Sequence, residues 1–153
     1  MRRAHASVVL AVAIAACGGG RETPAGPPGK VHAVVAPPTG DAAPWIAAQV
    51  AAAAERQVVV YVGAAWCEPC GYFHRAVEAG ELDAAFPRLT LLEFDLDLDQ
   101  ARLEAAGYTS QMIPLFMRPA ADGRASGRQI QGSIKGPGAV AEITPRLRRL
   151  IAD

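Results

Sequence analysis

The sequence carries no excess of charge of either sign, and this excludes one broad class of function. Its 15 lysine and arginine residues balance 15 aspartate and glutamate residues, so the formal net charge at pH 7 is +0. A general nucleic-acid binder needs a basic face, so we expect no nucleic-acid partner. Hydrophobic residues make up 51% of the 153 residues, which is enough for a packed core in one ordinary domain.

Cysteine is scarce, and its small number limits the chemistry that the chain can support. The three cysteines are Cys17, Cys67 and Cys70. An odd number argues against a disulfide scaffold unless one cysteine has another role. The chain has no second CxxC pair, and glycine rather than histidine follows Cys70. These absences argue against a four-cysteine zinc site and against covalent haem attachment, and we expect no cofactor and no resident metal.

A long hydrophobic run is also missing at the N-terminus. Arg2 and Arg3 precede an apolar stretch of about ten residues, 7–16, whereas a membrane-spanning helix needs about 20 residues. A positively charged start followed by a short apolar run is typical of a signal peptide. We assign that signal peptide to residues 1–16.

The end of this segment reads IAAC at positions 14–17 and resembles a bacterial lipobox. The resemblance implies cleavage before Cys17 and attachment of a lipid to its sulfur, so that the membrane is a partner through a lipid anchor. It also implies a location in the bacterial cell envelope, facing the periplasm or extracytoplasmic space, where disulfide bonds persist. An ordinary secretory signal, with Cys17 incidental, is the alternative.

The remainder of the chain divides into a linker and one predicted domain. Residues 17–40 are dominated by glycine and proline and show no persistent apolar period, which predicts a flexible linker after Cys17. The domain is predicted over residues 41–153, with Asp41 capping its first helix. Apolar patterns predict strands at 58–64, 89–96, 115–118 and 127–132, and helices at 43–56, 67–79, 99–106 and 137–152. This order implies a mixed four-stranded sheet covered by helices and ending in a hairpin.

The motif WCEPC, residues 66–70, lies between a buried strand and a helix in this prediction. A helix N-terminus presents unpaired N–H groups and a partial positive charge, which stabilise a thiolate and make Cys67 a nucleophile. Cys70, one turn later, is close enough to form a disulfide with it, and Pro69 is tolerated in the first turn. The pattern therefore favours a redox pair over a metal site.

Three stretches resemble the thioredoxin family, and they follow one another in the family's order. Residues 58–70, VVVYVGAAWCEPC, resemble its active-site strand and motif, in which tryptophan precedes CxPC. Residues 112–116, MIPLF, resemble its cis-proline loop, and 127–136 resemble its last hairpin strand and glycine. The resemblance covers about residues 41–152. It implies a thioredoxin-like three-layer α/β/α sandwich.

The resemblance also implies an activity, namely thiol–disulfide exchange with protein disulfides as substrates. Cys67 would attack the substrate disulfide and Cys70 would resolve the mixed disulfide. Pro114 would be cis, so that the backbone of Ile113 pairs with an extended substrate, and Trp66 would shield the sulfurs or pack in the core. A membrane or periplasmic electron donor would restore the dithiol.

Two positions bear on the rate and direction of the exchange. Thioredoxins usually carry a buried aspartate six residues before the first cysteine, where this chain has Tyr61, a poor base at neutral pH. Resolution by Cys70 would then either be slower or use Glu68, as the one carboxylate near the sulfurs, through water. A carboxylate beside Cys67 also disfavours its thiolate, which favours a reductase or isomerase-like role over oxidase activity. The alternative is that Glu68 is a solvated residue at the start of the helix, where its charge suits the helix dipole. The CEPC tetrad resembles the membrane-tethered reductases of cytochrome c maturation, although the chain lacks their insertion.

A copper(I) metallochaperone of thioredoxin fold is the competing hypothesis. Soft thiolates suit copper(I), and Cys67 and Cys70 could bind it with His74 or Met112. Pro69 and the cis-proline candidate favour the oxidoreductase, because a copper carrier does not need to dock a peptide.

Overall fold

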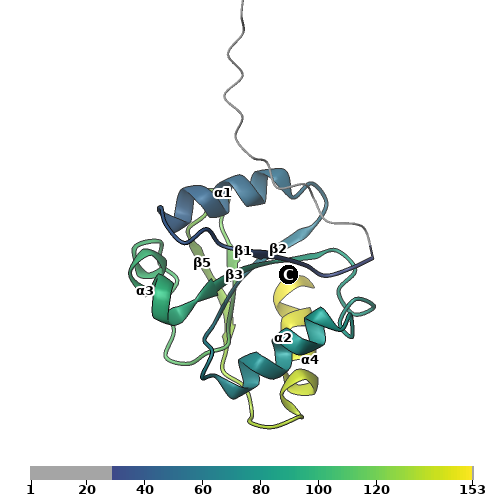
Figure 1. Ribbon diagram of the computed structural model, residues 1–153. Coiled ribbons are helices and arrows are strands. Elements are labelled where there is room, and N and C mark those ends of the chain that lie inside the picture. The colour runs from purple at the N-terminus through teal and green to yellow at the C-terminus, as the bar shows by residue number, and fades with distance from the viewer. Residues whose placement is uncertain (1–28, 153) are drawn as a thin grey trace, which may run out of the picture.

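The computed structural model describes residues 29–152 as a five-stranded mixed sheet covered by four helices (Figure 1). The predicted signal peptide, lipobox and Cys17 lie outside the described residues. The elements run in the order β1 (His32–Val35), α1 (Ala42–Ala52), β2 (Gln57–Gly63), α2 (Glu68–Glu78), β3 (Leu89–Asp95), α3 (Leu96–Ala105), β4 (Leu115–Pro119), β5 (Ala125–Gln131) and α4 (Ala139–Ala152). No helix within residues 29–152 is long and apolar enough to cross a bilayer.

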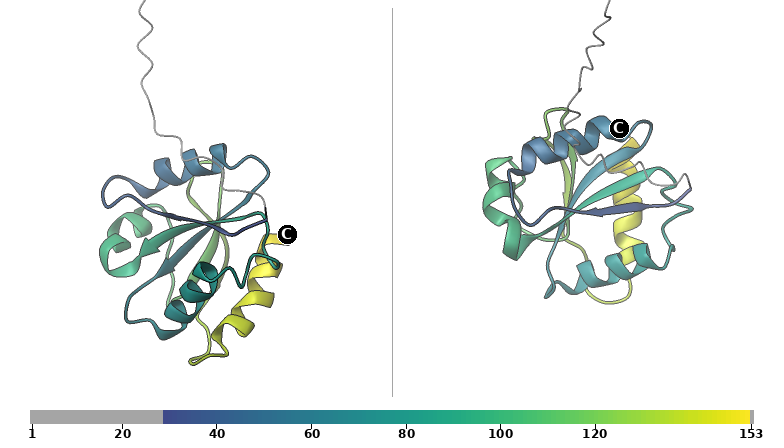
Figure 2. Two further views of the ribbon diagram at one scale, coloured as in Figure 1. Left: turned by 45° about the vertical axis from the view of Figure 1, so that its right-hand side comes forward. Right: turned by 45° about the horizontal axis from the view of Figure 1, so that its top comes forward.

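The strands lie in the order β1-β3-β2-β4-β5. The strands β1 and β2 pair in parallel with β3, whereas β4 is antiparallel to both β2 and β5. The helices α1 and α3 cover one face of the sheet, and α2 and α4 cover the other (Figure 2). The predicted three-layer α/β/α sandwich is thus confirmed.

Alternation along the central strand β2 explains why both faces are covered. Val58, Val60 and Val62 enter the core beneath α1 and α3, whereas Val59 and Tyr61 enter the core beneath α2 and α4. All five side chains are buried. A continuous apolar run of this kind is expected for a strand buried on both faces.

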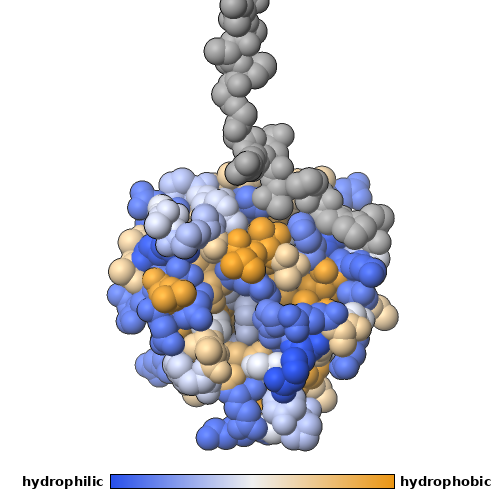
Figure 3. Space-filling model, viewed as in Figure 1, coloured by the Kyte–Doolittle hydropathy of each residue, from blue (hydrophilic) through white to orange (hydrophobic). Residues whose placement is uncertain are grey.

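The sheet has five strands instead of the expected four, because the segment HAVV forms β1 at its edge. The amide of Gly29 donates to the carbonyl of Pro87, and Ala36 donates to the carbonyl of Glu93, so hydrogen bonds hold both flanks of β1. The expected linker, residues 17–40, therefore does not extend across His32–Val35. Figure 3 shows apolar surface gathered over this edge of the sheet, and Val35 is 75% exposed.

Three aspartates account for the junction between β3 and α3. The side chain of Asp95 accepts a hydrogen bond from the amide of Asp97 at 2.8 Å, and Asp99 accepts from the amide of Asp95 at 2.9 Å. These bonds satisfy amide groups that a helix N-terminus leaves unpaired. The helix therefore begins at Leu96, three residues before the predicted start.

Candidate functional site

The redox motif lies where β2 ends and α2 begins, as predicted. Cys67 and Cys70 form a disulfide with their Cα atoms 5.2 Å apart. Cys67 is the N-cap residue of α2, and its Sγ accepts a hydrogen bond from the amide of Cys70 at 3.3 Å. Pro69 lies buried in the first turn. The sulfur of Cys67 thus occupies the position of an N-cap oxygen, where amide groups favour negative charge.

Both cysteines are nearly inaccessible, with relative exposures of 5% for Cys67 and 3% for Cys70. Trp66, by contrast, is 66% exposed, and its indole N–H donates to Asp97 at 2.9 Å. Trp66 therefore belongs to the surface next to the disulfide and not to the core, which decides between the two positions considered for it. Asp97, which bonds it from the first turn of α3, was not predicted as a site residue.

A groove of about 310 Å³ passes beside Trp66. Its lining includes Met112 and Ile113 from the loop before β4, and Gly132, which follows β5 and lies next to Met112. The Ile113–Pro114 peptide bond is cis, as the resemblance implies, and the carbonyl of Pro114 accepts from the amide of Gly132 at 2.9 Å. A β-carbon on Gly132 would come within 3.2 Å of the Met112 methyl group, so glycine keeps this groove open.

Glu68 bonds to a neighbouring loop in this structure. Its side chain is exposed, and Oε1 accepts a hydrogen bond from the amide of Gly136 at 3.1 Å. This contact ties the redox motif to the loop before α4. Glu68 is a neighbour of Cys67 in sequence, but its carboxylate has a partner of its own.

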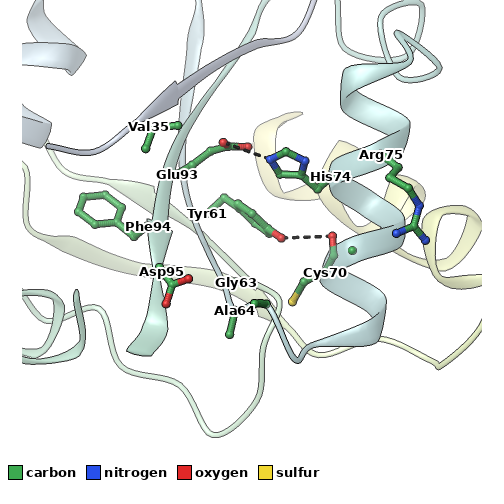
Figure 4. A pocket seen from close by; sticks show the side chains of 12 residues that line it. Val35, Tyr61, Gly63, Ala64, Cys70, His74, Arg75, Glu93, Phe94 and Asp95 are labelled. Atoms are coloured by element: carbon green, nitrogen blue, oxygen red, sulfur yellow. Dashed lines mark hydrogen bonds and ion pairs between the residues drawn. The ribbon is translucent and has the colours of Figure 1, made fainter. Parts of the chain in front are cut away.

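The expectation that Glu68 is the one carboxylate near the sulfurs is wrong. Glu93 and Asp95 on β3 line the same cavity as Cys70 and Tyr61 (Figure 4). The pairing of β2 with β3 sets Tyr61 opposite Glu93, and the two side chains therefore share the face covered by α2. A single glutamate inside a run of buried residues, LTLLEFD, is the sequence signal that could have identified this position.

Tyr61 is buried at the position where thioredoxins usually carry an aspartate, but its hydroxyl donates a hydrogen bond and does not act as a base. Its side chain is 4% exposed, and its hydroxyl donates to the carbonyl of Cys70 at 3.5 Å. Burial raises the pKa of Tyr61 above its usual range, and the charge of Glu93 raises it further. Tyr61 therefore stays protonated at physiological pH.

His74 does not join the cysteines in a ligand cluster. Its Nε2 lies 3.6 Å from Glu93 Oε2 and its Nδ1 lies 3.4 Å from Glu78 Oε1. Across residues 29–152 no group of three or more histidine, cysteine, aspartate or glutamate side chains is arranged to hold a metal ion. The geometry thus offers no specific support for the copper hypothesis.

No family model matches the sequence, and no curated protein matches it. Solved structures do match. Thioredoxin f from spinach chloroplast, in its long form, shares 18% identity over 82% of this chain and 88% of its own, with a TM-score of 0.52. Thioredoxin from Trichomonas vaginalis shares 17% identity over 78% of this chain and 94% of its own, with a TM-score of 0.50. The chain has the thioredoxin fold.

Proposed function

We propose that this chain is an envelope-anchored thiol–disulfide oxidoreductase that reduces disulfide bonds in other proteins. The observation that carries the proposal is the Cys67–Cys70 disulfide at the first turn of α2, with Sγ of Cys67 accepting the amide of Cys70. A sulfur held at a helix N-terminus is stabilised as a thiolate. The groove past Trp66 and Ile113 supplies an adjacent surface for an extended peptide.

The reaction starts from the reduced pair. The thiolate of Cys67 attacks one sulfur of the substrate disulfide, forming a mixed disulfide and releasing the other substrate sulfur as a thiolate. The thiolate of Cys70 then attacks Sγ of Cys67, so that the Cys67–Cys70 bond forms and the bond to the substrate breaks. The substrate leaves with both sulfurs reduced, and a membrane or periplasmic dithiol donor reduces the pair again.

Trapping the mixed disulfide tests the activity. In a Cys70→Ser variant the second step is blocked, so protein substrates should accumulate on Cys67 and be released by dithiothreitol. A Cys67→Ser variant is the matched control and should trap none. Failure of the first variant to trap any substrate, together with stoichiometric copper on the purified protein, would replace this proposal with the copper carrier.

The reductase direction rests on Glu68, whose charge beside Cys67 opposes thiolate formation. Equilibration with glutathione buffers measures the potential directly. We expect a value close to that of thioredoxin, about −270 mV, and a value near that of the strong oxidant DsbA, about −120 mV, would overturn the direction.

The envelope location rests on the sequence of residues 1–17. When growing cells are labelled with a palmitate analogue, the protein should carry the label. After cell fractionation it should be found in the membrane fraction. The Cys17→Ser variant should lose both the label and the membrane association. Equal labelling of the two forms would remove the lipid anchor from the proposal.

A further inference from the structure

A cavity of about 390 Å³ lies beside Cys70 and shares no lining residue with the groove that contains Trp66. Cys70 lines this cavity from α2, Tyr61 lines it from β2, and Glu93 lines it from β3 (Figure 4). Its apolar portion includes the exposed side chain of Val35. A cavity with this volume and several polar groups can admit water.

The resolving step creates a need for a proton acceptor here. Cys70 must lose its proton before its sulfur can attack Cys67. The thiol of a buried cysteine ionises less readily than that of an exposed one, and Cys70 is 3% exposed. Tyr61 is in contact with Cys70, yet it is a protonated donor that cannot take a further proton.

Glu93 and Asp95 are the two carboxylates that line the cavity. Asp95 already accepts a hydrogen bond from the amide of Asp97, so Glu93 is the candidate to receive this proton. Its side chain is 11% exposed, and it lies opposite Tyr61 in the strand pairing. Burial raises the pKa of Glu93 above its ordinary value, His74 offsets part of that rise, and Glu78 adds to it. A raised value brings a carboxylate closer to the neutral range in which a general base works best.

His74 connects this carboxylate to solvent. It lies one turn after Cys70 on α2, is 44% exposed, and places Nε2 3.6 Å from Glu93. Histidine is the side chain best suited to pass a proton between a buried group and water. The ionisable groups that face Glu93 from the elements around it are Tyr61 on β2, Asp95 on β3, and His74, Arg75 and Glu78 on α2.

We infer that Glu93 accepts the proton of the Cys70 thiol through water in this cavity and that His74 carries it to solvent. The inference rests on the proposed thiol–disulfide exchange and names the groups that serve its second step. The proton leaves Cys70 for Glu93, the Cys67–Cys70 bond forms, and the substrate sulfur departs as a thiolate. No further oxidant or reductant takes part.

Stopped-flow reaction with dithionitrobenzoate separates the two steps. The reagent is added to the reduced full chain, in a Cys17→Ser background so that two thiols react. Attack by Cys67 releases a first thionitrobenzoate, and resolution by Cys70 releases a second. Glu93→Gln should slow the second release at least about tenfold at pH 7 and leave the first within about twofold. Above the pH at which Cys70 ionises unaided, the variant should approach the unmodified rate.

Matched variants distinguish proton transfer from a structural effect. Glu81→Gln removes an exposed carboxylate that does not line the cavity, so resolution should stay within about twofold. Glu93→Asp keeps a carboxylate and should restore most of the rate. The inference would be overturned if Glu93→Gln slowed the second release by the same factor at every pH. It would also be overturned if the variant left the rate of that release unchanged at pH 7. Absence of a second release from the unmodified pair would instead overturn the proposed exchange, and the inference with it.

Discussion

The amide of Cys70 donates a hydrogen bond to Sγ of Cys67 at 3.3 Å, while Cys67 itself caps the helix α2. The two sulfurs are therefore chemically unequal although both are buried. One lies at the positive end of a helix and accepts an amide, and the other lies within the first turn beside apolar groups and Tyr61. This inequality supports the proposed roles, in which Cys67 attacks and Cys70 resolves.

The first prediction concerns the reduced protein. Iodoacetamide should alkylate Cys67 before Cys70 at pH 7, because a helix N-terminus lowers the pKa of a thiol and burial raises it. Peptide mapping by mass spectrometry after short exposures measures the order. Preferential labelling of Cys70 would contradict the assignment of roles.

The second prediction isolates the charge of Glu68. Glu68→Gln keeps an oxygen that can accept from the amide of Gly136 and removes the negative charge near Cys67. The thiolate should become easier to form, so the potential should rise by roughly 10 mV, equivalent to an electrostatic effect of about half a kcal/mol. Equilibration with glutathione measures it, and an unchanged potential would reduce Glu68 to a solvated residue bonded to Gly136.

The third prediction concerns the packing of the turn between β4 and β5 on α1. Gly123 has a φ of +78°, and a β-carbon there would lie 1.9 Å from the carbonyl oxygen of Ala43. Gly123→Ala should lower the free energy of unfolding by at least about 3 kcal/mol, because the backbone of α1 must move. Gly127 is the matched control, since it has a φ of +80° and open space around it, so Gly127→Ala should cost only about 1 kcal/mol. Equal losses in urea unfolding would contradict the clash.

The fourth prediction follows from the raised pKa of Glu93. The folded protein binds a proton on this group more tightly than the unfolded chain does. The free energy of unfolding therefore falls as pH rises from the ordinary value of 4.5 through the raised value, and it levels off above that. Glu93→Gln lacks this titration, so its stability relative to the unmodified chain should increase from pH 4 to pH 7. Urea unfolding across this range measures the difference, and a difference that shrinks with pH would contradict the sign.

Glu93 also illustrates how far the sequence determines the site. The strand–CxxC–helix order is a local signal that apolar runs and motif spacing predict. The Ile113–Pro114 loop is also local, and the resemblance to the thioredoxin family predicts its role. The role of Glu93 depends on the register between β2 and β3 and on the side of α2 that carries His74. The glutamate that interrupts the apolar run LTLLEFD marks the position in the sequence. Neither relationship lies within one segment, however, so the sequence does not show that this glutamate, 23 residues after Cys70, lies on the same cavity as that cysteine.

The strand β1 is not apparent from the sequence for a different reason. HAVV is four residues long, stands at the edge of the sheet, and has a proline pair two positions after its last residue. Such a short segment alternates too few times to reveal a period of two, and its glycine- and proline-rich surroundings are typical of a linker. Its stability comes from pairing with β3, which lies far from it in sequence.

That edge strand has a consequence for handling the protein. Removal of residues 29–40, at the domain boundary that composition predicts, would leave the N–H and C=O groups of β3 without their β1 partners. A long apolar strand with an open hydrogen-bonding edge recruits strands from neighbouring molecules. We therefore expect a form that lacks the HAVV segment to associate with itself more readily than the full chain.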